Sequence, residues 1–118
     1  MEEHKIEIVY TSEFKRNLKI LAKKYRHIQE DIEPIIRDLQ AGKKLGEQII
    51  GVDKEVFKVR IRNRDSQKGK SGGYRCIYYV QTSEKIVLIT IYSKTEQSDI
   101  SNKCIKEIIE AFETDFFN

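Results

Sequence analysis

The sequence predicts an α+β domain in which an N-terminal strand and a two-helix arm pack on a mostly antiparallel four-stranded sheet, followed by a C-terminal helix. Two observations lead to this prediction. Apolar residues recur every three or four positions in three segments, and in four shorter segments they alternate with polar residues or run continuously. The 118 residues contain no low-complexity or linker-like stretch, so we expect a single domain over residues 1–118.

The first part of the chain is expected to form one strand and two amphipathic helices. Residues 5–10 alternate as a short strand, and Ser12 is expected to cap the helix that follows. A second helix, marked by a stripe of isoleucines, is expected to end at Gly42. With Asp31 as its N-cap, Pro34 would fall in the first turn, where its missing N–H is not needed; the alternative is a kink.

The second part of the chain is expected to form most of the sheet. After a loop with a short extended piece at residues 48–50, three strands are expected at residues 55–62, 73–81 and 85–93, the last two joined by a tight hairpin. The last strand is apolar on both faces, which is typical of a strand inside the sheet. Apolar residues at helical spacing predict a third helix over residues 99–116.

The charge of the chain is small overall but unevenly distributed. There are 22 Lys and Arg against 19 Asp and Glu, a formal net charge of +3. Residues 54–75 hold eight Lys or Arg and two acids, whereas residues 96–118 hold six acids and two lysines. A segregated basic region points to a partner rich in phosphate.

Several classes of protein are not expected from this sequence. No apolar run approaches the roughly 18–20 residues of a membrane span and no secretory signal is visible, so we expect a cytoplasmic protein without a membrane partner. Cys76 and Cys104 lack CxxC spacing, and His4 and His27 lack ligand spacing relative to either cysteine. We therefore expect buried thiols, no metal site and no cofactor.

The candidate site begins on the strand at residues 55–62. Lys58, Arg60 and Arg62 alternate there with apolar residues, which gives the strand a basic face and an apolar back. No carboxylate lies between these cations, whereas a face selected for solubility usually mixes signs. We therefore favour a phosphate-binding surface over the simpler reading, the solvated face of an antiparallel sheet.

The loop and strand that follow supply further candidates for RNA binding. Cations and a hydroxyl from the loop, and a tyrosine from the strand, complete this set: Arg64, Lys68, Lys70, Ser71 and Tyr74. Tyr74, Tyr78, Tyr79 and Tyr92 lie around the basic stretch and are expected to offer ring faces on which bases stack.

The chemistry available to this set is limited. No GxSxG, HExxH or Walker sequence is present, so catalysis would have to use Lys, Arg, Tyr or Ser. Attack of an RNA 2′-hydroxyl on its own 3′ phosphate suits such groups, because cations stabilise the charge that develops and positioning supplies much of the rate. A lysine crowded by other cations could accept the proton. Lys58 is one candidate, and Lys70 or Lys94 is a second.

Three motifs follow one another along the chain: a Lys-x-Arg strand at Lys58, a Gly-Tyr-Arg-x-x-Tyr strand at residues 73–78, and a closing strand that ends Tyr92-Ser93-Lys94. Together with the order of the elements, these motifs resemble the RelE/ParE superfamily of bacterial type II toxins. The chain is most similar to the RelE-like or HigB-like branch, whose members carry a Lys-Gly-Lys-Ser-Gly-Gly-Tyr-Arg stretch and an acidic Glu-x-x-Asp after the last strand. The resemblance covers nearly the whole chain and implies a small RelE-like fold.

The resemblance also implies an activity. Such a toxin enters the ribosomal decoding site and cleaves mRNA there without a metal, leaving a 2′,3′-cyclic phosphate, and a cognate antitoxin with a DNA-binding helix-turn-helix domain holds it inactive. Lys58, Arg60 and Arg75 would contact the scissile phosphate. Residues 95–101 lack the arginine that the family prototype carries after the last strand, and its C-terminal tyrosine has no counterpart, so Tyr92 or a lysine such as Lys94 would act as the base.

Two other functions are compatible with the sequence. One is a ParE-like inhibitor of DNA gyrase without nuclease activity, although chains of that kind generally lack a dense phosphate-binding cluster on the sheet. The other is a noncatalytic RNA-binding module, which the lack of His and Glu among the clustered cations favours.

Overall fold

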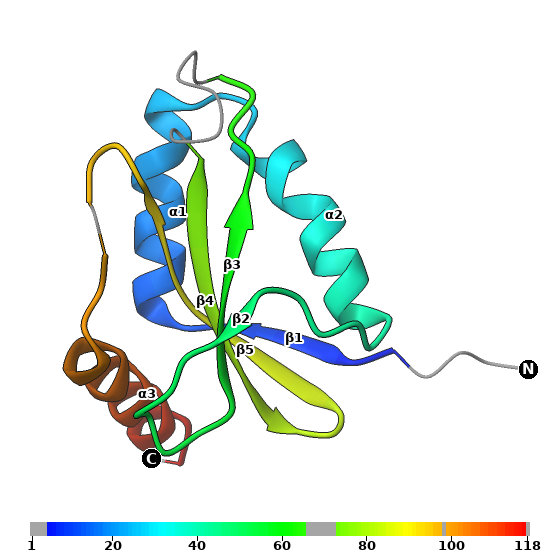
Figure 1. Ribbon diagram of the computed structural model, residues 1–118, viewed down its shortest axis with the longest axis vertical. Helices are drawn as coiled ribbons and strands as arrows, with labels where there is room; N and C mark the ends of the chain where they lie inside the picture. The colour runs from blue at the N-terminus through cyan, green and yellow to red at the C-terminus, as the bar shows by residue number, and fades with distance from the viewer. Residues whose placement is uncertain (1–4, 66–72, 98, 118) are drawn as a thin grey trace, which may run out of the picture.

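Five strands form one mixed sheet in the order β1-β5-β4-β3-β2 (Figure 1). The structure, a computed structural model, describes residues 5–65, 73–97 and 99–117. β1 pairs with β5 in parallel, and the other three pairings are antiparallel. The strands are β1 (Glu7–Tyr10), β2 (Glu47–Gln48), β3 (Val56–Ile61), β4 (Tyr74–Thr82) and β5 (Lys85–Ser93).

The predicted α+β class is confirmed, with one strand more than expected. The additional strand is the two-residue β2, which pairs with Phe57 and Lys58 of β3 and partly overlaps the extended piece predicted at residues 48–50. Gly46 lets the chain approach β3 closely. Its φ is +83°, and a Cβ at this position would lie 2.2 Å from the carbonyl oxygen of Lys58.

Helix α1 (Ser12–Lys24) is capped by Thr11, so the prediction of Ser12 as the cap is wrong. The Thr11 hydroxyl accepts a hydrogen bond from the N–H of Phe14 at 2.9 Å. It also donates to the carbonyl of Ile89 in β5 at 2.6 Å. Thr11 has the extended backbone that an N-cap requires, and its bond to β5 ties the start of the helix to the sheet.

Helix α2 (Ile28–Gln40) begins earlier than predicted, and Pro34 lies in its interior. Asp31 does not cap the helix. Its carboxylate accepts instead from the backbone N–H of Arg64 at 3.2 Å and from Arg64 Nε at 2.9 Å. The N–H of Asp31 donates to the carbonyl of His27 at 3.0 Å, so the helical pattern already includes Asp31.

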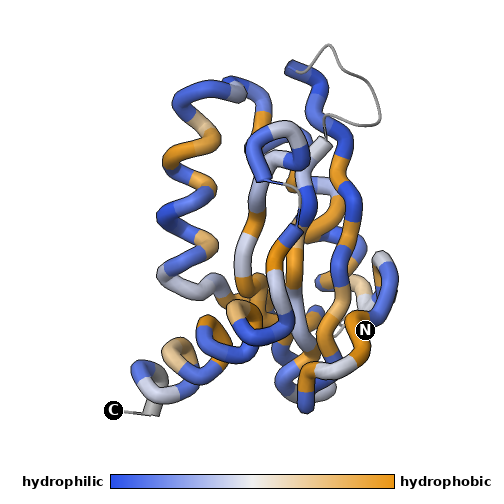
Figure 2. The backbone as a smooth tube through the Cα atoms, turned by 60° about the vertical axis from the view of Figure 1, so that its left-hand side comes forward, coloured by the Kyte–Doolittle hydropathy of each residue, from blue (hydrophilic) through white to orange (hydrophobic). Residues whose placement is uncertain are grey.

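Each face of the sheet has its own core. On one face Phe57, Val59 and Ile61 pack with residues of α1 and α2, as their alternation predicted. On the other face Val56 and residues of β4 and β5 pack with Ile105 and other residues of α3 (Asn102–Phe117). Figure 1 shows α3 towards one end of the molecule. Figure 2 shows apolar and polar residues alternating along the helices, a pattern that lets a helix pack by one side.

Helix α3 begins at Asn102 rather than at residue 99. The hydroxyl of Ser101 accepts from the N–H of Cys104 at 3.1 Å and thereby caps the first turn. Residue 99 therefore stays outside the helix, where its side chain can turn towards the sheet. Among the described residues, no helix combines the length and the apolar character needed to cross a membrane.

Candidate active site

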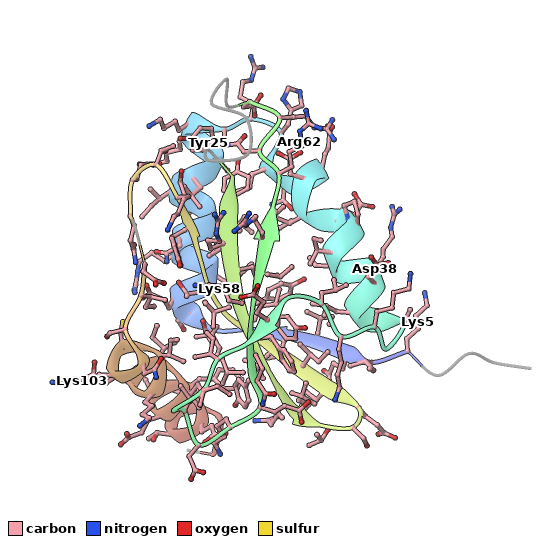
Figure 3. The ribbon with its side chains drawn as sticks, in the orientation of Figure 1. Lys5, Tyr25, Asp38, Lys58, Arg62 and Lys103 are labelled. Carbon is pink, nitrogen blue, oxygen red and sulfur yellow. The ribbon has the colours of Figure 1, made fainter. Side chains whose placement is uncertain are left out.

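Lys58, Arg60 and Arg75, which we call the basic cluster, lie on one face of the β3–β4 pair. In the antiparallel register Arg60 is directly opposite Arg75, and residues opposite each other point to the same face. Lys58 and Arg60 alternate with the apolar residues of β3 that pack on α1 and α2, so the cluster lies on the α3 face. Figure 3 shows Lys58 near the middle of the sheet.

The two arginines of the cluster face each other, and no carboxylate of the described residues forms an ion pair with either of them. Arg75 is 7% exposed, and its Nη1 donates to the carbonyl of Tyr74 at 3.2 Å. Like charges directly opposite each other destabilise a sheet. A guanidinium also has five donors to satisfy, so this arrangement suits a bound anion.

Asp99 joins the edge of the basic cluster from the segment between β5 and α3. Its Oδ1 lies 3.6 Å from Nζ of Lys58, accepts from the hydroxyl of Tyr92 at 3.2 Å, and accepts from the N–H of Ile100 at 2.9 Å. The bond from Ile100, with smaller effects of Lys58 and Tyr92, lowers the pKa of Asp99. Sequence reasoning did not assign Asp99; the only signal was its place in the Glu-x-x-Asp motif.

Tyr92 is a hydrogen-bond donor in this arrangement. It is directly opposite Arg75 in the β4–β5 register and is 5% exposed. Burial, with a smaller effect of Asp99, raises the pKa of Tyr92 to about 12. The phenol therefore keeps its proton near neutral pH, which argues against its predicted part as the base. Lys94 lies next to the start of β4, since its N–H donates to the carbonyl of Gly73 at 2.9 Å.

Comparison with protein families identifies the chain. A family model described as the RelE toxin of the RelE / RelB toxin-antitoxin system matches residues 8–114. The chain belongs to the RelE toxin family. The match extends from β1 into α3 and includes the whole basic cluster and Asp99, and the resemblance found in the sequence is thereby confirmed.

The other predicted RNA contacts of this RelE-family toxin are more scattered. Arg62 is exposed just beyond β3, towards one end of the molecule (Figure 3). Arg64 is tied to α2 by ion pairs to Asp31 and to Glu30, each at 2.9 Å, so an RNA phosphate would have to compete with two carboxylates. Lys68, Lys70 and Ser71 lie outside the described residues.

The expectation that tyrosine rings offer stacking surfaces is wrong for all four residues: Tyr92 is only 5% exposed, and the other three are more deeply buried. Tyr74, Tyr78 and Tyr79 are each fully buried. Tyr74 and Tyr78 point into the core with α1 and α2, and Tyr79 points into the core with α3. Tyr74 makes an edge-on contact with the ring of Tyr25 at 5.7 Å. Because helices cover both faces here, these rings stabilise the fold and are not available to a base.

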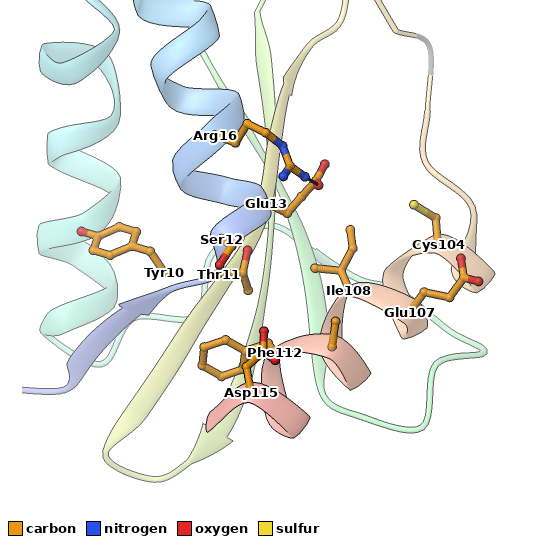
Figure 4. Close-up of a pocket in the computed structure, with 11 residues that line it drawn as sticks. Tyr10, Thr11, Ser12, Glu13, Arg16, Cys104, Glu107, Ile108, Phe112 and Asp115 are labelled. Carbon is orange, nitrogen blue, oxygen red and sulfur yellow. Dashed lines mark hydrogen bonds and ion pairs between the residues drawn. The ribbon is translucent and has the colours of Figure 1, made fainter. Parts of the chain in front are cut away.

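A separate cavity of about 460 Å³ lies between the start of α1 and α3 (Figure 4). Its lining includes the carboxylates Glu13, Glu107 and Asp115 beside Ile108 and Phe112. No residue of the basic cluster lines it. The concentration of negative charge makes this cavity unsuitable for an RNA phosphate, so the basic cluster remains the candidate site.

The cysteines and the histidine that the structure describes lie apart from one another, and none of them belongs to the basic cluster. In the part of the chain that the structure describes, no group of three or more His, Cys, Asp or Glu side chains could hold a metal ion. Cys76 and Cys104 are free thiols. Cys76 is buried, as predicted, and burial raises its pKa to about 12, whereas Cys104 is only half-buried. His27 is exposed and bonds through Nδ1 to Asp65 at 2.7 Å, away from the basic cluster.

Proposed function

We propose that this RelE-family toxin is a ribosome-dependent mRNA endonuclease that needs no metal of its own. The observation that carries the proposal is the basic cluster, in which a buried Arg75 faces Arg60 across two strands with no carboxylate partner among the described residues. In the proposed reaction a 2′-hydroxyl attacks the adjacent phosphate and the 5′-oxygen leaves. The products are a 2′,3′-cyclic phosphate and a free 5′-hydroxyl.

The basic cluster would act on the charge of the transition state. Negative charge increases on the non-bridging oxygens as the 2′-oxygen bonds to phosphorus, so donors already aimed at those oxygens bind the transition state more tightly than the substrate. Arginine suits this part because its planar guanidinium can contact two oxygens at once. The paired strands β3 and β4 hold Arg60 and Arg75 in place before the substrate binds.

The ribosome would present the mRNA, and weaker contacts would orient the toxin on it. The residues that we propose for these weaker RNA contacts are Arg62, Lys68, Lys70 and Ser71. Arg64 could join them only by breaking its ion pairs with Glu30 and Asp31 of α2.

A cognate RelB-type antitoxin carrying a helix-turn-helix domain would oppose the reaction in the cytoplasm. We expect an acidic segment of that antitoxin to cover the basic cluster, so the association rate should fall as salt rises. An association rate that is indifferent to ionic strength would count against this mode of inhibition.

A purified translation system tests the proposed function. A defined mRNA is incubated with the toxin in the presence and absence of translating ribosomes, and the new 3′ ends are mapped and tested for a cyclic phosphate. We expect cuts only on translating ribosomes. If the mRNA stays intact while the toxin inhibits DNA supercoiling by gyrase, the ParE-like alternative is correct. If the toxin binds RNA but cuts none, it is a noncatalytic module.

A further inference from the structure

The family match leaves the proton acceptor of the proposed reaction unassigned, and the geometry points to Asp99. We propose that Oδ2 of Asp99 removes the proton from the attacking 2′-hydroxyl, an inference that rests on the proposed function. It replaces the bases expected from the sequence, which were Tyr92 or a lysine.

The contacts of Asp99 leave one of its two carboxylate oxygens available. All three of its described side-chain contacts, to Lys58 Nζ, to the Tyr92 hydroxyl and to the Ile100 N–H, involve Oδ1. No described residue bonds to Oδ2, and the side chain of Asp99 is 64% exposed. The carboxylate is thus fixed at one oxygen and open to a substrate at the other, as a preorganised base should be.

Asp99 also lies where a base for this phosphate is needed. Lys58, its partner at 3.6 Å, belongs to the basic cluster. Its other partner, Tyr92, is directly opposite Arg75 in the sheet. A phosphate held by Arg75 and Arg60 would therefore have Asp99 at its edge, within reach of the neighbouring ribose.

The competing acceptors fit less well. Tyr92 is 5% exposed, and its hydroxyl donates a hydrogen bond to Asp99. It would have to break this bond before it could accept a proton from the substrate. Lys58 directs its Nζ at the carboxylate of Asp99, 3.6 Å away, so this group is already engaged by an acid. His27 faces Asp65 near the start of α2. Asp99 alone combines an ionised acceptor with an open oxygen beside the cluster, among the residues that the structure describes.

The proposed step is balanced. The 2′-hydroxyl proton moves to Oδ2 of Asp99 as the 2′-oxygen forms its bond to phosphorus. The bond between phosphorus and the 5′-oxygen breaks, and the 5′-oxygen leaves with the electron pair and takes a proton from water. Asp99 then releases its proton to solvent, so the enzyme returns to its starting state without a metal or a redox partner.

The dependence of the rate on pH distinguishes Asp99 from the other candidates. The charged and titratable groups that face Asp99 are Lys58 from β3 and Tyr92 from β5, with Arg75 of β4 acting on Tyr92. The lowered pKa of Asp99 means that the base is ionised throughout the range in which ribosomes work. The single-turnover rate on saturating ribosomes should therefore be nearly constant from about pH 6.5 to 8. A rate that rises about tenfold per pH unit over this range would assign the proton to a lysine or to Tyr92 and overturn the proposal.

Substitution supplies the second test. Asp99→Asn should lower the single-turnover rate by about 10²- to 10⁴-fold, and its residual rate should rise with pH because hydroxide replaces the base. Asp99→Glu should recover part of the loss. The matched control is Glu96→Gln, which removes a carboxylate from the same segment that bonds instead to Tyr25 and Lys24; it should cleave at nearly the wild-type rate.

The outcomes separate the two proposals. If the wild-type toxin cuts no mRNA, the proposed function fails. If the wild type cuts and Asp99→Asn cuts equally fast, only the assignment of the base fails. A thermal melt and antitoxin binding show whether Asp99→Asn is folded, and if it is not, the pH profile of the wild type still decides.

Discussion

Replacing Arg75 by methionine should lower activity without lowering stability. Methionine retains most of the apolar stem of the side chain but removes the guanidinium. In the folded protein Arg75 is 7% exposed and lies opposite Arg60, and its guanidinium has one described hydrogen bond, to the carbonyl of Tyr74. The buried charge therefore gains little from the protein itself, and we expect its main partner to be the substrate.

The two effects can be estimated separately. Loss of a preorganised donor to a developing oxyanion costs about 3 kcal/mol, or roughly a hundredfold in single-turnover rate. For stability, the lost hydrogen bond is worth about 1 kcal/mol. In the opposite direction, removing the like charge directly opposite Arg60 should stabilise the folded protein by about 0.2–1 kcal/mol. The variant also no longer has to bury a charge, which stabilises it further. We expect a melting temperature that is unchanged or higher by up to about 4 °C for a domain of this size.

The assay combines single-turnover cleavage on saturating ribosomes with thermal unfolding of the free toxin. Lys19→Met is the matched control, since it removes one exposed cation from α1, far from β3 and β4 in sequence. It should change neither the rate on saturating ribosomes nor the melting temperature. Arg75→Met that cleaves as fast as the wild type would refute a catalytic part for Arg75. A melting temperature lowered by more than about 5 °C would show that the fold itself depends on the guanidinium.

Three further predictions concern the stability of the folded protein. Gly46→Ala should lower the free energy of unfolding in urea by more than about 1 kcal/mol, because its Cβ would lie 2.2 Å from a carbonyl oxygen of β3. Gly42→Ala is the control: Gly42 also has a positive φ, +90°, but no atom lies within 4 Å of the added Cβ, so this variant measures the cost of the positive φ alone. Tyr78→Phe should cost about 1–2 kcal/mol in the same measurement, since the hydroxyl accepts from the N–H of Leu45 at 2.9 Å and donates to its carbonyl at 2.5 Å; an unchanged midpoint would mean that water replaces both bonds. The pKa of Asp99 is lowered in the folded protein, so its stabilising contribution is present above the unfolded value near 3.9 and is lost as pH falls through the folded value. The difference in melting temperature between the wild type and Asp99→Asn should accordingly be constant above about pH 5 and diminish as the pH falls below the unfolded value, and a difference that grows in acid would contradict the shift.

The faces of β3 were predictable from sequence because the period of a strand is fixed by its geometry. Once Phe57 and Val59 face a core, Lys58 and Arg60 must face the other way. The helix caps were not predictable in the same way. Thr11 and Ser12 are both suitable caps, and the choice depends on a bond from Thr11 to Ile89, which is distant in sequence. The same holds for Asp31, whose carboxylate is occupied by Arg64.

The candidate site was predictable only in part. Alternation places Lys58 and Arg60 together, but it does not give the register that puts Arg75 opposite Arg60. The burial of the tyrosines was not predictable from their spacing: Tyr78 and Tyr79 are adjacent and point to opposite faces, and each face is covered by helices that are distant in sequence. Asp99 belongs to an acidic segment whose sequence is typical of a solvent-exposed surface. Asp99 lies beside Lys58 only because this segment folds back over the sheet after β5.

The position at which α3 begins links the fold to the proposed chemistry. A helix that started at residue 99 would have Asp99 in its first turn. The structure prevents this by two contacts that fix the start of the helix. Ser101 caps the first turn, and the side chain of Asn102 donates to the carbonyl of Ile50 at 2.9 Å. The segment before α3 thus stays outside the helix and brings Asp99 within 3.6 Å of Lys58, so the proposed base and its place beside the basic cluster follow from one short stretch of chain.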